Sequence, residues 1–152
     1  MSLKVRTASP GDARDARRLL RELGHTEDGL MHLEARLEAL ARDSQAVILV
    51  AEAHGRVVGL ASGSATLLLE YPAPQLRLHA LVVDPDQRRR GVARALVAEV
   101  EARARGLGCF RVELTSAHTL TAAHAFWRAA GYAETGRRFV RRLCEARLNG
   151  VS

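Results

Sequence analysis

A strongly basic loop joins an apolar strand to an amphipathic helix near the middle of the chain. The pattern predicts the strand over residues 76–83 and the helix over residues 91–105, with Gly91 at the junction. The loop between them carries three successive cations, Arg88, Arg89 and Arg90. A helix N-terminus already has unpaired N–H groups and about half a positive charge, so cations beside it are unfavourable unless an anion binds there. The segment therefore predicts a site for a phosphate-bearing ligand, with a solvated basic loop as the alternative.

Strand and helix patterns alternate along the rest of the chain. Alternating or short apolar runs predict strands, whereas apolar residues three and four apart predict helices. The expected elements are a strand at 3–8, helices at 12–23 and 28–42, a hairpin of 46–53 and 56–64, a strand at 109–115, a helix at 122–130 and a last strand within 132–143. The order β-α-α-β-β-β-α-β-α-β predicts an α/β fold whose mixed sheet is covered by helices on both faces. A length of 152 residues corresponds to one domain, 1–152.

The composition excludes several classes of protein. With 47% apolar and 26% charged residues, the chain is an ordinary globular mixture and not a disordered one. The longest apolar runs fall far short of the ~20 residues that span a bilayer, and the N-terminus lacks a secretory apolar region. We therefore expect a cytoplasmic protein without membrane contact. Cys109 and Cys144 form no disulfide framework, and neither the cysteines nor the six histidines have the spacing of metal ligands.

The net charge of +6 comes almost entirely from arginine, because Lys4 is the single lysine. Such a surface suits nucleic acid or a polyphosphate cofactor. An aromatic content of 4% and the lack of a nucleic-acid-binding motif weigh against nucleic acid, which stays a minor alternative. Among known phosphate loops, G-x-x-x-x-G-K-[ST] does not occur, and Gly106-Leu107-Gly108 precedes a strand, whereas a dinucleotide fingerprint follows one.

Two segments carry a family resemblance. Residues 88–93, Arg-Arg-Arg-Gly-Val-Ala, match the pattern Q/R-x-x-G-x-G/A, and residues 122–132, Ala-Ala-His-Ala-Phe-Trp-Arg-Ala-Ala-Gly-Tyr, resemble A-x-x-F-Y-x-x-x-G-F/Y. With these motifs and its order of elements, the chain resembles the GNAT superfamily of N-acetyltransferases over about its whole length. The resemblance implies acetyl-CoA or a related acyl-CoA as donor, no metal, and direct attack of a neutral amine on the thioester carbonyl. It leaves the acceptor open between a small molecule and a protein or peptide amine.

The resemblance also implies which residues bind the cofactor. In the family, the strand before the loop pairs its backbone with the pantetheine arm, which carries over to Leu81, Val82 and Val83. The loop holds the pyrophosphate, which carries over to Arg88, Arg89, Arg90, Gly91, Val92, Ala93 and Arg94. A backbone N–H near Val83 would stabilise the developing oxyanion. Trp127 of the second motif is expected beside the cofactor.

An amine with a pKa near ~10 must lose a proton before it attacks, so a general base is expected. Many family members place a glutamate on the strand that ends at the pyrophosphate loop, and His79 stands at that position here. A histidine with a pKa near ~6.5 accepts a proton at neutral pH. Glu113, on the neighbouring strand, is the alternative base. Each residue also has a purely structural interpretation: His79 fills the face of the sheet, and Glu113 pairs with an arginine.

Trp127 occupies the position at which many family members carry a tyrosine that protonates the departing thiolate. An indole N–H is no acid near neutral pH, so either CoA leaves as a thiolate, with a thiol pKa of ~8.5, or another group protonates it. Tyr132 is the nearest phenol, at a position more often used for packing. Leu120 replaces a frequent asparagine, and His118 follows the strand expected to flank the cofactor. These departures keep open a non-catalytic acyl-CoA-binding relative. The resemblance further suggests a homodimer formed through the last strand.

Overall fold

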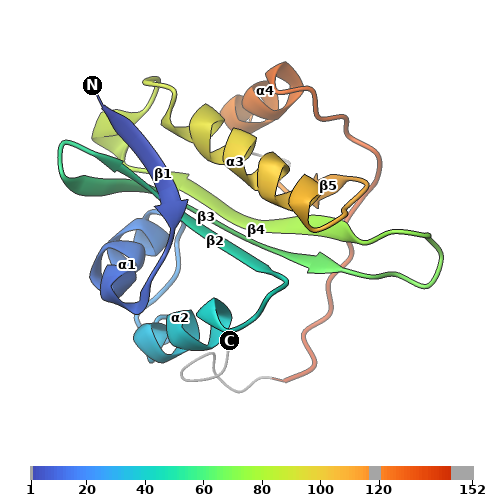
Figure 1. Cartoon of the computed structure of the whole chain (residues 1–152), viewed down its shortest axis with the longest axis horizontal. Helices are drawn as coiled ribbons and strands as arrows, with labels where there is room; N and C mark the ends of the chain where they lie inside the picture. Colours follow the sequence, from blue (N-terminus) through green and yellow to red (C-terminus); the bar gives the residue numbers. More distant parts are fainter. Residues whose placement is uncertain (1, 117–120, 145–152) are drawn as a thin grey trace.

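Five strands of the described residues form one mixed sheet. The structure, a computed structural model, describes residues 2–116 and 121–144. The strands follow the order of the chain: β1 (Leu3–Thr7), β2 (Ala46–Ala53), β3 (Arg56–Thr66), β4 (Gln75–Val83) and β5 (Val112–Leu114) (Figure 1). Neighbours are antiparallel except β4 and β5, which are parallel and are therefore connected by a crossover helix, α3 (Val92–Gly106).

Helices cover both faces of the sheet, as the sequence predicts. On one face lie α1 (Ala13–Glu22), after the short 3-10 turn η1 (Pro10–Asp12), and α2 (Leu33–Ala41), and on the other lie α3 and α4 (Thr121–Ala129) (Figure 1). Each face has its own apolar core. Leu96 and Val100 of α3 pack on one face, and Leu19 of α1 and Leu37 of α2 pack on the other. Within the described ranges, no helix has the length and apolar character needed to cross a membrane.

The hairpin between β2 and β3 forms where the sequence predicts it. His54 and Gly55 have φ of 56° and 73°, the pair of left-handed residues that a tight two-residue hairpin turn requires. The second helix is shorter than predicted. It begins at Leu33 and not near Asp28, because His32 directly before it has φ of 60°, which ends any helical path. Strand β5 is also shorter than predicted, with three residues in place of the expected strand over 109–115.

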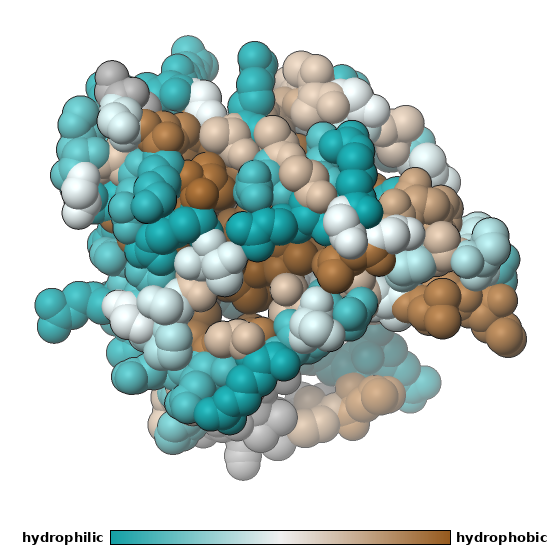
Figure 2. Space-filling view, viewed as in Figure 1, coloured by the Kyte–Doolittle hydropathy of each residue, from teal (hydrophilic) through white to brown (hydrophobic). Residues whose placement is uncertain are grey.

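The predicted last strand is wrong for the described residues. From residue 133 to residue 144 the chain forms no strand and leaves α4 as an extended segment that descends to the level of α2 (Figure 1). Its apolar side chains are exposed: Phe139 by 91%, Val140 by 68% and Leu143 by 93%. The local pattern of a strand is present, but a strand needs a paired neighbour, and no strand of the described residues pairs with this segment. Figure 2 shows a second group of exposed apolar side chains at the β3–β4 loop, where Leu67 and Leu69 lie.

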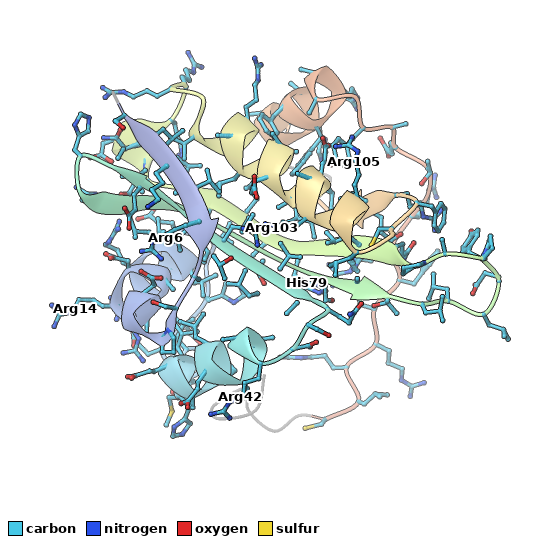
Figure 3. The ribbon with its side chains drawn as sticks, in the orientation of Figure 1. Arg6, Arg14, Arg42, His79, Arg103 and Arg105 are labelled. Carbon is cyan, nitrogen blue, oxygen red and sulfur yellow. The ribbon has the colours of Figure 1, made fainter. Side chains whose placement is uncertain are left out.

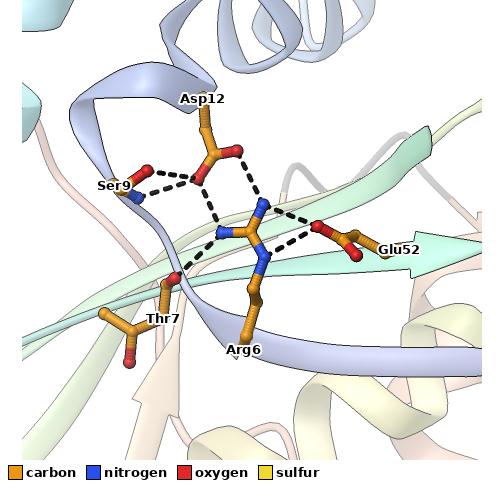
Figure 4. A network of polar contacts seen from close by, with 5 residues as sticks. All are labelled: Arg6, Thr7, Ser9, Asp12 and Glu52. Atoms are coloured by element: carbon orange, nitrogen blue, oxygen red, sulfur yellow. Dashed lines mark hydrogen bonds and ion pairs between the residues drawn. The ribbon is translucent and has the colours of Figure 1, made fainter. Parts of the chain in front are cut away.

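Arg6 ties β1 to both α1 and β2 (Figure 4). Its guanidinium donates two hydrogen bonds of 2.8 Å to the carboxylate of Asp12, and its Nε donates one of 2.8 Å to Glu52. The Ser9 N–H also donates to Asp12, at 2.8 Å. Hydrogen bonds from Arg6 hold the pKa of Asp12 below its usual value, against the opposing effect of burial. The network fixes the start of α1 against the sheet.

Candidate active site

One edge of β4 is only partly paired. On one side β4 pairs with β3 from Gln75 to Val83. On the other side it pairs with β5 only from Leu76 to Leu78. In the part of the chain that the structure describes, no strand lies beside β4 beyond Leu78 on that side. The C-terminal half of β4 therefore presents a free backbone edge.

A β-bulge at His79 decides which backbone groups reach that free edge. In the pairing with β3, Ala80 faces Ser62 but Leu78 faces Gly63, so His79 is the extra residue. The bulge brings the two strands so close that a Cβ at Gly63 would lie 2.8 Å from the carbonyl oxygen of Arg77. Glycine is required at this position because any side chain would push the strands apart.

The bulge reverses the direction of the backbone groups along β4. Before it, the Leu76 N–H donates to Arg111 O at 2.9 Å, toward β5. After it, the Asp84 N–H donates to Val58 O at 2.9 Å, toward β3. Because the direction alternates along a strand, Leu81 and Val83 point their N–H and C=O groups to the free edge. Val82 points its groups to β3, which corrects the prediction that all three residues offer their backbone to the cofactor.

The loop after β4 leads to an uncapped helix start. After the 3-10 turn η2 (Pro85–Gln87), Arg89 has φ of 64°, and Gly91, the N-cap of α3, has φ of 81°. A Cβ at Gly91 would meet no atom within 4 Å, and the first turn of α3 has neither a capping side chain nor an acidic residue. The N–H groups at the start of α3 are therefore available to an anion.

Four cations surround this helix start. The side chains of Arg88, Arg89, Arg90 and Arg94 are exposed, and none of them forms an ion pair or hydrogen bond within the described residues. Nine other arginines of the described residues form an ion pair with a carboxylate, among them Arg6, Arg56 and Arg103. Among the described elements, these four arginines are thus the one group of unpaired cations that lies at an uncapped helix N-terminus. This is the arrangement that the basic loop in the sequence predicts.

Asp84 anchors the beginning of the loop. Its side chain is only 5% exposed and accepts a hydrogen bond of 2.6 Å from Arg56 and another from Arg18 of α1. Its carbonyl oxygen accepts the Gln87 N–H at 2.9 Å. Arg18 also donates to Val57 O at 2.8 Å. The anchor joins the loop to α1 and to the start of β3, and the sequence analysis did not identify it, because its partners lie far away along the chain.

His79 projects from the bulge on the α1–α2 side of the sheet, near its middle (Figure 3). Its Nε2 lies 2.9 Å from Ser64 Oγ on β3, a partner that the sequence analysis did not identify. Partial removal from water, and then the nearby Arg77 cation, lower the pKa of His79 below its usual value. The imidazole is therefore neutral at pH 7 and able to accept a proton.

Glu113 is held in a polar cluster on β5. Its Oε1 accepts hydrogen bonds from Gln75 at 2.9 Å and from Arg77 at 3.0 Å. The second guanidinium nitrogen of Arg77 donates to Thr115 at 2.6 Å. The structure therefore contains the ion pair with an arginine that the structural interpretation of Glu113 predicts. Of the two candidate bases, His79 is the one without a cationic partner on its ring.

The aromatic residues of the second motif pack together. Trp127 is half-buried against the α3-side core, with its ring 5.0 Å from that of Tyr132. The Tyr132 hydroxyl donates to Glu101 at 2.8 Å. Burial, and next this hydrogen bond, raise the pKa of Tyr132 above its usual value, so its phenol is poorly suited to protonate a thiolate. His118 and Leu120 lie outside the described residues. Among the described residues no three His, Cys, Asp or Glu side chains are grouped to hold a metal ion.

Comparison with known proteins identifies the family. The profile of the Acetyltransferase (GNAT) family matches residues 14–132, which span the free edge of β4, the basic loop and both sequence motifs. The chain belongs to the GNAT family of acetyltransferases. It is an acetyl-CoA-dependent N-acetyltransferase. The expected donor and reaction type are therefore confirmed, and the alternative of a non-catalytic acyl-CoA-binding relative is set aside.

Relatives of this GNAT chain include aminoglycoside acetyltransferases. The chain is 35% identical over 138 residues to an aminoglycoside N(6')-acetyltransferase type 1 of Stenotrophomonas maltophilia, with 88% of each chain covered. It is 25% identical to AAC(6')-Iy in a complex with a bisubstrate analogue of CoA and acetylneamine, with a TM-score of 0.81 over 95% of this chain and 100% of the other. A transcriptional regulator of Bacillus halodurans, at 20% identity, shares the fold with a TM-score of 0.83 over 93% of this chain and 100% of the other.

Proposed function

We propose that the chain acetylates an amino group of an aminoglycoside-like amino sugar. The observation that carries the proposal is the free edge of β4 leading directly into an open, cationic helix start, which fits an acyl chain followed by a diphosphate. The identity of 35% to an aminoglycoside N(6')-acetyltransferase supports the choice of acceptor. The alternative acceptor, a protein or peptide amine, has no comparable support.

In this proposal, the two ends of acetyl-CoA have separate sites. The N–H groups of Val92 and Ala93, with the cations of residues 88–90 and Arg94, bind the pyrophosphate. The free N–H and C=O groups of Leu81 and Val83 pair with the amides of the pantetheine arm. Such pairing would direct the thioester along β4 toward the bulge. Of the two free N–H groups, that of Leu81 lies nearer the bulge, so in this proposal the Leu81 N–H, and not the expected Val83 N–H, donates to the oxyanion that forms on the thioester carbonyl.

His79 acts as the general base in the proposed reaction. It takes a proton from the acceptor ammonium, directly or through one water, and the neutral amine attacks the thioester carbonyl. The C–S bond then breaks, which releases the N-acetyl product and the CoA thiolate. The second proton that the attacking nitrogen must lose passes to solvent. CoA leaves as a thiolate that no side chain protonates, because Trp127 has no acidic proton and the Tyr132 hydroxyl is hydrogen-bonded to Glu101.

Exposed carboxylates before α2 and in its first turn would attract a polycationic acceptor. Glu27 is already engaged by Arg17, at 3.4 Å, and by Arg21. Asp28 and Glu34 are exposed and form no ion pair within the described ranges. Both lie on the α1–α2 side of the sheet, as His79 does. We expect the variant Asp28→Asn/Glu34→Gln to raise KM for an aminoglycoside several-fold and to leave KM for acetyl-CoA unchanged.

Release of free thiol from acetyl-CoA tests the acceptor. The sharpest comparison uses two aminoglycosides that differ only at the 6' position, one with an amine and one with a hydroxyl, such as neomycin and paromomycin. We expect rapid thiol release with the 6'-amine and slow release with the 6'-hydroxyl. Equal rates with both would place the acetylated amine elsewhere on the sugar. A complete lack of release with either compound, in a protein that binds CoA, would refute the aminoglycoside acceptor.

The pH dependence of kcat/KM tests the base. We expect His79→Ala to lower kcat/KM by about 100-fold, a typical loss for a general base, and to abolish its acid limb. Glu113→Gln is the matched control and should keep the acid limb. An unchanged profile in His79→Ala would assign the role to Glu113 or to water. The cytoplasmic location and the homodimer expected from the sequence also remain predictions.

A further inference from the structure

We propose that Ser64 is a positioning residue for His79: its Oγ accepts the Nε2–H of the imidazole, which leaves the lone pair of Nδ1 free to take a proton from the acceptor. The proposal rests on the proposed function, in which His79 is the general base. It adds the ring atom that receives the proton and the residue that orients this atom. The observation that carries it is the distance of 2.9 Å between Ser64 Oγ and His79 Nε2.

The bulge in β4 sets up this contact. In the pairing of the two strands, Ser64 faces Arg77 and Ser62 faces Ala80, so His79 lies between the two serines and is paired with neither. Both serines are half-buried and, being two residues apart in β3, lie on the same face of the sheet as His79. Within the described residues the imidazole bonds to Ser64 alone, and the Ser62 hydroxyl forms no hydrogen bond.

The position of Ser64 decides which ring nitrogen faces the acceptor. Ser64 belongs to β3, whereas the free edge lies on the opposite side of β4, so Nε2 is directed away from the edge where the thioester is proposed to bind. The two nitrogens of an imidazole point in divergent directions. Nδ1, which has no hydrogen-bond partner among the described residues, is therefore the atom that can meet the amine.

One of the two possible hydrogen bonds between Ser64 and His79 is compatible with proton transfer. A neutral imidazole has one N–H and one nitrogen with a free lone pair. If the Ser64 hydroxyl donated to Nε2, the proton would lie on Nδ1 and no lone pair would face the amine. If Nε2–H donates to Ser64 Oγ, Nδ1 is free, and the bond strengthens when the ring becomes charged. Ser64 thus orients the base and stabilises the imidazolium that forms.

The charges around His79 give this role a measurable sign. Partial removal from water, and then the Arg77 cation on the same strand, lower the pKa of His79. On β5, Glu113 faces Arg77 and accepts its hydrogen bond at 3.0 Å. On this face β3 has the hydroxyls of Ser62 and Ser64 beside the ring and no charged side chain. A hydrogen bond to the charged ring opposes burial and Arg77, so its loss should lower the pKa of His79 further.

Nuclear magnetic resonance reads the protonated nitrogen directly. Long-range ¹H–¹⁵N correlation spectra show the tautomer of each histidine ring, and a spectrum of His79→Ala identifies the signals of His79. Above the pKa we expect the wild-type ring to be protonated on Nε2 and the ring in Ser64→Ala to be a mixture of tautomers. The pKa of His79 should fall by roughly 0.5 in Ser64→Ala, because the charged ring loses an acceptor. A wild-type ring protonated on Nδ1 would overturn the proposal.

Steady-state kinetics with a 6'-amino aminoglycoside shows whether the contact serves catalysis. Ser64→Ala should lower kcat/KM about 10-fold, less than the loss of the base itself, and should move its acid limb to lower pH. KM for acetyl-CoA should not change. Ser64→Thr keeps a hydroxyl and should restore both the rate and the pH profile. Ser62→Ala is the matched control on the same face of β3 and should keep both. Calorimetric binding of CoA checks that each variant is folded.

The two measurements separate a failure of Ser64 from a failure of His79. If the titration of the ring moves in Ser64→Ala but the kinetic acid limb does not, the limb belongs to another group, and the base is refuted together with its positioning residue. If the wild-type limb follows the titration of His79, but Ser64→Ala changes neither the tautomer nor the limb, the base stands and the role of Ser64 is refuted.

Discussion

Gly91→Val tests directly whether the start of α3 holds the diphosphate of CoA. Gly91 has φ of 81°, and a side chain added there projects into open space at the helix start. A non-glycine residue in the left-handed region costs about 1–3 kcal/mol. For a domain of this size each kcal/mol lowers Tm by roughly 2–4 °C, so the folded variant should melt roughly 2–12 °C lower.

The loss of CoA affinity should far exceed the loss of stability. A hydrogen bond to a charged group contributes about 1.5–3 kcal/mol, and the isopropyl group would displace the diphosphate from at least two N–H donors. The resulting loss of about 3 kcal/mol corresponds to a rise of roughly 100-fold in the Kd for CoA. Isothermal titration calorimetry at 25 °C measures it on the folded variant.

Gly24→Val is the matched control for backbone strain. Gly24 follows α1, has φ of 92°, and likewise has no atom within 4 Å of a Cβ. Both variants should therefore lose similar stability, but Gly24→Val should bind CoA as the wild type does. If Gly91→Val is folded and keeps the Kd of the wild type, the diphosphate is not bound at this helix start and the assignment of the loop is wrong.

Four further outcomes follow from single contacts. Asp84→Asn should raise KM for acetyl-CoA several-fold with little change in kcat, because Asp84 positions the loop and touches no reacting atom; steady-state kinetics separates the two. Arg77→Gln removes a cation that lowers the pKa of His79, so the acid limb of kcat/KM should move to higher pH. Tyr132→Phe should keep kcat within about twofold and lose about 1 kcal/mol of stability in urea unfolding, since its hydroxyl serves a structural hydrogen bond. The pKa of Asp12 is depressed in the folded state, so its contribution is complete above the unfolded value of 3.8 and is lost as pH falls below it; the stability gap between the wild type and Asp12→Asn should narrow from pH 5 to pH 2.

Local patterns in the sequence predict most of the fold. The hairpin turn at His54-Gly55, the strand that ends at Asp84 and the helix that starts after Gly91 all follow from residue types within a few positions of one another. The basic loop is predicted for the same reason, because its charge and the helix start are adjacent in the chain. These features depend on interactions between residues that are close along the chain, so the sequence alone is enough to predict them.

Contacts between distant segments are the part that the sequence does not reveal. Asp84 is bound by Arg18 and Arg56, which no local pattern connects to the loop. The segment over residues 137–143 gives a further case, because it has the apolar pattern of a strand but pairs with no strand among the described residues. The β-propensity of a segment indicates that it can form a strand, but hydrogen bonding to a neighbouring strand decides whether it does.

In the proposed reaction, the bulge at His79 links cofactor binding to proton transfer through one extra residue. Without it, the alternation that directs Leu76 toward β5 would direct Ala80 and Val82 to the free edge and turn Leu81 and Val83 toward β3. The same residue carries the imidazole on the face where the acceptor is expected. Position along β4 therefore sets both the proposed oxyanion donor and the proposed base, and their separation is fixed by covalent geometry within a single strand. A scaffold of this kind needs no movement of one element against another to align the two groups, which is the preorganisation that efficient transfer to an amine requires.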